Sequence, residues 1–137
     1  MALFGLLGNK NKGYASPWLQ LTVVYATARD GLDPEHAFVL RGHVISAHSL
    51  QFEFLKPGSF LVFFAGTAEG LSAGTRLADT MRNYAREKSV ESFGVGVLQG
   101  ECLAQMRGPG RLAAKPAGQV ITEAMKQAAI EAEADAQ

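Results

Sequence analysis

The stretch GVGVLQGECLAQMRGPGRL, residues 94–112, begins with alternating glycine and valine and ends in a segment that is rich in glycine and arginine. Gly94 and Gly96 fall on one face of the strand that this alternation predicts, and Val95 and Val97 fall on the other. A glycine inside a strand often marks a place where another segment approaches the backbone closely. We therefore expect a helix, rather than a ligand, against the glycine face.

The rest of this stretch predicts a turn, a second short strand and a Gly-Pro-Gly loop. Upstream, WLQLTVVYATA has the β-branched and aromatic side chains typical of a buried strand. The helices are predicted from apolar residues at spacings of three and four. In chain order the expected elements are strand 18–28, helix 33–48, strands 50–55 and 60–65, helix 67–88, strands 92–98 and 101–106, and helix 118–132.

This order contains the βαββαβ plan of a ferredoxin-like α+β sandwich, an antiparallel sheet with helices on one face. We expect a single domain over residues 17–134, because no repeat or linker interrupts the pattern.

Composition limits the partners and the compartment. The 137 residues include 13 Lys plus Arg and 13 Asp plus Glu, so no net charge attracts nucleic acid. The single cysteine, Cys102, excludes an internal disulfide, which fits a cytoplasmic protein, and its position predicts a small apolar residue in a strand. The three histidines do not have the spacing of a helical metal site, and no metal or other cofactor is expected.

Residues 1–16 predict an apolar N-terminal arm. Its apolar run is too short to span a bilayer, and its lysines follow the run instead of preceding it, unlike a secretory signal. The arm is either mobile or a hook for a partner or a membrane surface. Its large apolar residues, which are candidate interface residues, are Leu3, Phe4, Leu6 and Leu7.

The stretch FGVGVLQGECLAQMRGPGRL resembles the catalytic domain of class III adenylate and guanylate cyclases. That family has a strand of the form F-x-V-G-I-H-x-G-E, a second strand, and a loop that ends in an Arg-aromatic or Arg-Leu pair. The matching residues here are Phe93, Gly96, Gly100, Glu101 and Arg111-Leu112. LTVVYATARDG, GSFLVFFAG and AGQVITEAMKQA resemble the family's first strand, hairpin strand and following helix, so the likeness covers roughly residues 18–130 of a truncated cyclase domain.

The resemblance also implies which catalytic groups are missing. The two metal-binding aspartates of the family correspond to Thr27 and to Gly58 or Ser59, none of which can replace a carboxylate. Uncharged residues also occupy the other expected catalytic positions: Ile121 and Met125 for the transition-state residues, Phe54 for the base-reading lysine, and Gly118 or Gln119 for the base-reading aspartate. The resemblance therefore predicts a domain without cyclase activity.

Three functions follow from these observations. The main hypothesis is a regulatory, protein-interacting domain of a bacterial type that forms a homodimer or binds a partner, with Phe52 and Phe54 as further interface candidates. A second is a sensor for a nucleotide or cyclic dinucleotide. Its candidate anion-binding residues are Arg107, Gly108, Gly110, Arg111 and Lys115. A third is a BLUF-like flavin photoreceptor, in which Tyr25 would stand for the family's tyrosine.

Overall fold

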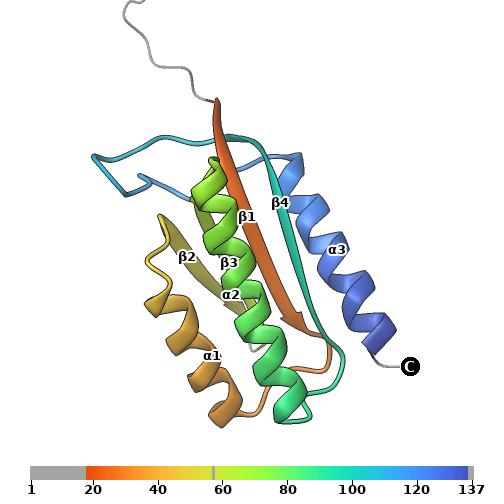
Figure 1. The fold of residues 1–137 in the computed structure, drawn as a ribbon. Coiled ribbons are helices and arrows are strands. Elements are labelled where there is room, and N and C mark those ends of the chain that lie inside the picture. Colours follow the sequence, from red (N-terminus) through yellow and green to blue (C-terminus); the bar gives the residue numbers. More distant parts are fainter. Residues whose placement is uncertain (1–17, 57, 136–137) are drawn as a thin grey trace, which may run out of the picture.

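A computed structural model describes residues 18–56 and 58–135. The described part contains four strands and three helices, arranged as Figure 1 shows. In chain order they are β1 (Trp18–Ala28), α1 (Pro34–Ser46), β2 (Gln51–Lys56), β3 (Ser59–Ala65), α2 (Ala68–Glu87), β4 (Phe93–Leu103) and α3 (Gln119–Asp135). The strands form one antiparallel sheet in the order β2-β3-β1-β4, which confirms the α+β ferredoxin-like plan.

The two faces of the sheet carry separate cores because successive side chains of β1 point to opposite sides. Val24 and Ala26 belong to a cluster with residues of α1 and α2. Val23 and Tyr25 belong to a second cluster with Ala124 and other residues of α3. The expectation of helices on one face is therefore correct for α1 and α2, whereas α3 covers the opposite face.

The glycine face of β4 explains how α3 comes so close to the sheet. A Cβ atom on Gly94 would overlap the carbonyl oxygen of Ala128, and one on Gly96 would overlap that of Ala124. Ala132 continues this row of small, buried residues along α3. The predicted role of the glycines, close approach of a helix, is confirmed.

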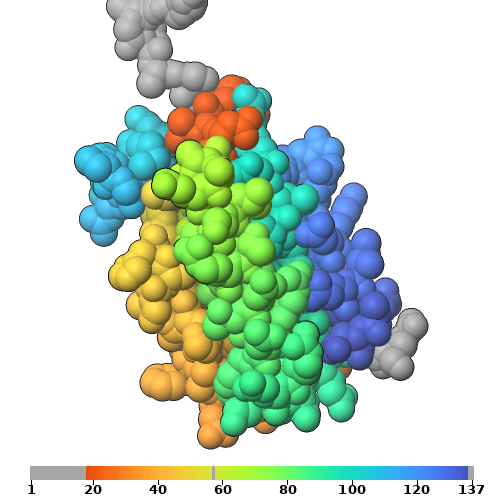
Figure 2. Space-filling view, in the orientation of Figure 1, coloured from red at the N-terminus to blue at the C-terminus, as the bar shows by residue number. Residues whose placement is uncertain are grey.

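β4 differs from the predicted pair of short strands. It runs without a turn through Gly100, which pairs with Leu21, and the whole of Trp18–Ala28 pairs with Phe93–Leu103. Gly100 therefore does not form the predicted turn. Its missing side chain instead leaves room for Val120, which packs against this position of the strand. Only the loop after Leu103 leaves the sheet, and it projects beside the body of the molecule (Figure 2).

The outer edge of β4 is covered by side chains of α3. The backbone N–H groups of Phe93, Val95 and Val97 donate hydrogen bonds to acceptors spaced four residues apart on the helix. These donor–acceptor pairs are Phe93 to Asp135 at 3.2 Å, Val95 to Glu131 at 3.3 Å and Val97 to Gln127 at 2.7 Å. One helical turn advances nearly as far as two strand residues, so the two rows stay in register. The acidic tail is therefore helical as far as Asp135, beyond the predicted end at 132.

Candidate functional site

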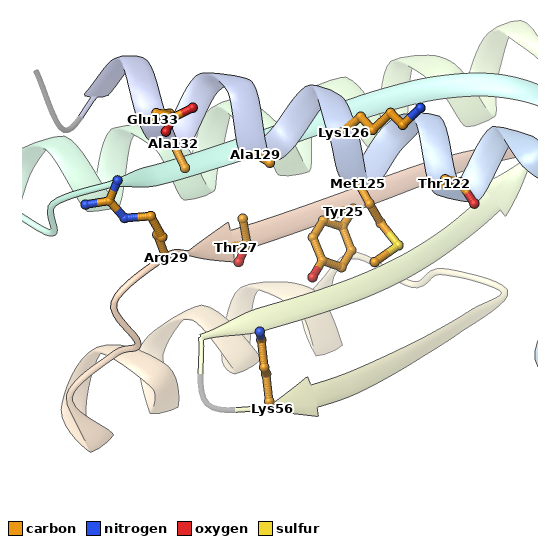
Figure 3. A pocket seen from close by; sticks show the side chains of 10 residues that line it. All are labelled: Tyr25, Thr27, Arg29, Lys56, Thr122, Met125, Lys126, Ala129, Ala132 and Glu133. Atoms are coloured by element: carbon orange, nitrogen blue, oxygen red, sulfur yellow. The ribbon is translucent and has the colours of Figure 1, made fainter.

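A groove of about 540 Å³ lies between α3, the end of β1 and the β2–β3 hairpin (Figure 3). Cavities of this size hold small organic ligands. Its lining residues are Tyr25, Thr27, Arg29, Lys56, Thr122, Met125, Lys126, Ala129, Ala132 and Glu133. The sequence had pointed to Tyr25, Thr27 and Met125 for other reasons, but not to the charged residues of the groove.

Two periodicities bring this lining together. On β1, Tyr25 and Thr27 follow Val23 on the face that α3 covers, because alternate residues share a face. On α3, residues three or four positions apart line one side of the helix, and Met125 points down toward the Tyr25 ring in Figure 3. Lys56, at the end of β2, reaches toward the groove from the hairpin.

The charges of the groove are unequal, since three cations face one carboxylate. Arg29 contacts Asp30 at 3.5 Å in an exposed ion pair. Within residues 18–56 and 58–135, no carboxylate lies within ion-pairing distance of Lys56 or Lys126. Lys126 and Glu133 lie along the outer side of α3, at the rim (Figure 3). The groove is therefore electrostatically suited to an anion.

The two positions expected to correspond to the metal-binding aspartates do lie together. Thr27 pairs with Ser59 across β1 and β3, and their hydroxyl oxygens are 3.0 Å apart in a hydrogen bond. Gly58 has φ +96°, and a Cβ there would lie 3.1 Å from the Cα of Gly31, so this turn favours glycine. Among the described residues, no three His, Cys, Asp or Glu side chains are grouped as a metal site requires.

The other expected catalytic positions do not all reach the groove. Met125 lines it, but Ile121 is buried in the core under α3. Phe54 lies on the opposite face of the sheet, where its ring contacts Phe60 and the guanidinium of Arg41. Gly118 lies against Glu101 and Cys102, near the far end of β4, as does the adjacent start of α3. The groove is thus lined by only some of the residues at the catalytic positions that the resemblance suggests.

The glycine-rich loop forms an exposed turn away from the groove. The backbone N–H of Arg107 donates to the carbonyl of Arg111 at 2.8 Å, which closes the turn. Gly108 and Gly110 have φ of +76° and +72°, and a Cβ on either would meet open space. Lys115 makes an ion pair with Glu53 at 3.4 Å. The turn brings the backbones of the two arginines together, and among the described residues no other part of the fold approaches Gly108 or Gly110 to form the wall of a site.

The interface candidates divide between described and masked parts of the chain. Phe52 and Phe54 lie on β2 with ring centroids 5.2 Å apart, and Phe52 is 38% exposed. The candidates Leu3, Phe4, Leu6 and Leu7 lie outside the described residues. In the part of the chain that is described, no helix combines the length and apolar character needed to cross a membrane.

Comparison with solved structures supports a cyclase-like fold. The chain is similar to a bacterial light-regulated adenylyl cyclase, with 13% identity over 90% of this chain and a TM-score of 0.59. It is also similar to the guanylyl cyclase Cya2, with 17% identity over 85% of this chain and 71% of the other, and a TM-score of 0.55. The chain spans 43% of the light-regulated cyclase. No protein-family model and no curated protein matches it.

Proposed function

We propose that this chain is a cyclase-like domain that does not form cyclic nucleotides and acts through association. The observation that carries the proposal is the Thr27–Ser59 hydroxyl pair, at the place where the resemblance expects carboxylates. Hydroxyl groups are neutral, whereas Mg²⁺ in nucleotide-processing sites is usually held by at least one carboxylate. The cations Arg29 and Lys56 beside this pair would further disfavour a divalent metal ion.

The direct test is product formation. The purified chain is incubated with ATP or GTP and Mg²⁺ or Mn²⁺, and cyclic nucleotide is measured by mass spectrometry. We expect no product above a protein-free blank. Sustained turnover that disappears in the Met125→Ala or Lys56→Ala variant would assign the activity to the groove and overturn the proposal.

Association is supported by the contrast between the two edges of the sheet. The β4 edge is covered by α3, as described above, whereas β2 is the opposite edge and pairs only with β3 within the described residues. An open edge offers backbone donors and acceptors to another strand. The partly exposed ring of Phe52 lies on this edge strand. We propose that a second copy, or a regulatory partner, binds at β2.

Light scattering over a dilution series tests the homodimer. We expect a dimer that Phe52→Lys weakens, because it places a charge at the centre of the contact. Leu71→Lys is a matched control, since Leu71 is 39% exposed but lies on α2. A monomer at high micromolar concentration in the unchanged chain would exclude the homodimer. Equal weakening by both variants would exclude β2 as its interface.

A further inference from the structure

The groove described above carries Arg29 and Lys56 toward one end, here called the cationic end, and Tyr25 and Met125 toward the other, the apolar end. Glu133 lies on the α3 rim near Arg29, and Lys126 lies on the rim near Met125 (Figure 3). Arg29 and Thr27 lie at the end of β1, with Lys56 reaching toward them from the hairpin (Figure 3). Farther along the groove, Met125 points toward the ring of Tyr25, and Thr122 lies close by. A ligand that satisfies both ends is an organic molecule with a compact anionic head and a flat, mostly apolar body.

We propose that this groove binds a small organic phosphate directly, without a bridging metal ion. Phosphate matches these donors because guanidinium and ammonium groups bind its oxygens by charge-assisted hydrogen bonds, and its several oxygens can contact more than one cation at once. When Ser59 donates the hydrogen bond between the two hydroxyls, the Thr27 O–H is a further donor at the same end. The inference rests on the proposed lack of metal chemistry, because the neutral hydroxyls of Thr27 and Ser59 stand where the resemblance expects metal-binding carboxylates, and Arg29 and Lys56 lie beside them.

The apolar end of the groove requires that the ligand also has an apolar body. Met125 is 38% exposed, and Ala129 and Ala132 continue the α3 wall from Met125 toward Arg29 (Figure 3). A thioether beside a tyrosine ring packs well against a planar group. An aromatic phosphate should therefore bind more tightly than pyrophosphate, which has charge but no apolar body.

Among the described residues, Glu133 is the only carboxylate that lines the groove, and it gives a prediction of opposite sign. Glu133 lies at the rim and repels an incoming phosphate. Glu133→Gln should therefore tighten binding of any phosphate, whereas Lys56→Ala should weaken it. A variant that gains affinity cannot be explained by loss of folding.

The test is isothermal titration calorimetry of the full chain with pyrophosphate, phenyl phosphate and AMP in EDTA at low salt. We expect AMP and phenyl phosphate to bind, and Lys56→Ala to weaken both about tenfold, as loss of a charged hydrogen bond does. Met125→Ala should weaken the aromatic phosphates but leave pyrophosphate unchanged. Higher salt should weaken all three.

Arg107→Ala combined with Arg111→Ala is the control, because it removes two exposed cations far from the groove. It should bind like the unchanged chain, and circular dichroism verifies that every variant is folded. No binding of any probe at millimolar concentration, or loss of binding only in the loop variant, would overturn the inference. Binding that requires Mg²⁺ would also overturn it. Cyclic nucleotide formation, measured separately, bears on the proposed function and not on metal-free binding.

Discussion

Arg82 of α2 reaches around the outer edge of β4 and binds Glu131 of α3 through two hydrogen bonds, of 2.9 and 3.0 Å. The same guanidinium donates to the carbonyl of Val95 at 2.9 Å, and Glu131 accepts from the Val95 N–H at 3.3 Å. One ion pair thus satisfies both outward-facing backbone groups of an edge residue. It also links helices that lie on opposite faces of the sheet.

Removing this ion pair should destabilise the fold. Arg82→Ala should lower the free energy of unfolding by about 1–2 kcal/mol, because it deprives Glu131 and Val95 of their donor. Both side chains are about one-third exposed, which keeps the expected loss modest. A double-mutant cycle with Glu131→Ala in urea should give a coupling near 1 kcal/mol.

Arg86 provides the control for this measurement. It lies one turn farther along α2, is exposed and bonds only locally to Asn83 among the described residues, so Arg86→Ala should change stability by about 0.5 kcal/mol or less. The hydrogen bonding of Arg82 to the Glu131 carboxylate raises the pKa of the Arg82 guanidinium. A cation with a raised pKa loses its stabilising effect only in strongly alkaline solution, so the coupling should not change between about pH 6 and 9. Equal losses for the Arg82 and Arg86 variants would show that the edge contact does not contribute to stability.

The order of the elements was predictable because each buried element has its own local pattern of apolar residues in the sequence. The apolar run at 60–65 and the β-branched stretch at 18–28 became the two central strands, which are covered on both faces. The face of the sheet that α3 covers was not predicted, because the residues that determine it lie in two segments that are distant in the sequence. The close contact between β4 and α3 can be recognised only when Gly94 and Gly96 are considered together with the row of alanines on α3.

The candidate site was predicted only in part, for a related reason. The resemblance placed the family's two metal-binding aspartates at Thr27 and at Gly58 or Ser59, and the sheet register sets Thr27 beside Ser59. The cations Arg29, Lys56 and Lys126 come from three separate elements, and each resembles an ordinary solvated charge in sequence. Alternation along β1 would have placed Tyr25, Thr27 and Arg29 on one face, but it gives no information about which helix faces them.

The BLUF alternative makes a simple spectroscopic prediction. Tyr25, which would stand for the tyrosine of the photoreceptor family, lines the groove with its ring near Met125. We expect the protein purified by gel filtration to have no absorption band near 450 nm. A retained flavin band whose light response is lost in Tyr25→Phe would favour the photoreceptor over the association function.

Cys102 should be unreactive in the native state. Its side chain is fully buried, and burial raises the pKa of its thiol. A raised thiol pKa lowers the thiolate fraction, so a disulfide reagent at pH 8 should label the chain only in urea. The same shift stabilises the fold below the thiol's ordinary pKa of 9.0, and this contribution should be lost as pH rises through the higher folded value.

An exposed thiol on the same strand is the control for this labelling experiment. Cys102→Ala combined with Leu103→Cys moves the thiol to a position that is 47% exposed. This variant should react within minutes without urea. Rapid labelling of Cys102 in the native chain would mean that β4 opens readily at this end.

The close contact between β4 and α3 predicts an asymmetry between two glycine substitutions. Gly96→Ala should lower the free energy of unfolding by about 2 kcal/mol or more, because the new methyl group would overlap the Ala124 carbonyl and force the helix away. Gly42→Ala, within α1, should instead stabilise the fold by about 0.5–1 kcal/mol, since no atom lies within 4 Å of the new Cβ and alanine favours helix. Urea unfolding of both variants measures the difference. If Gly96→Ala kept full stability, the backbone contact between β4 and α3 could not be as close as described, and a ligand-accessible role for the glycine face would become the better explanation.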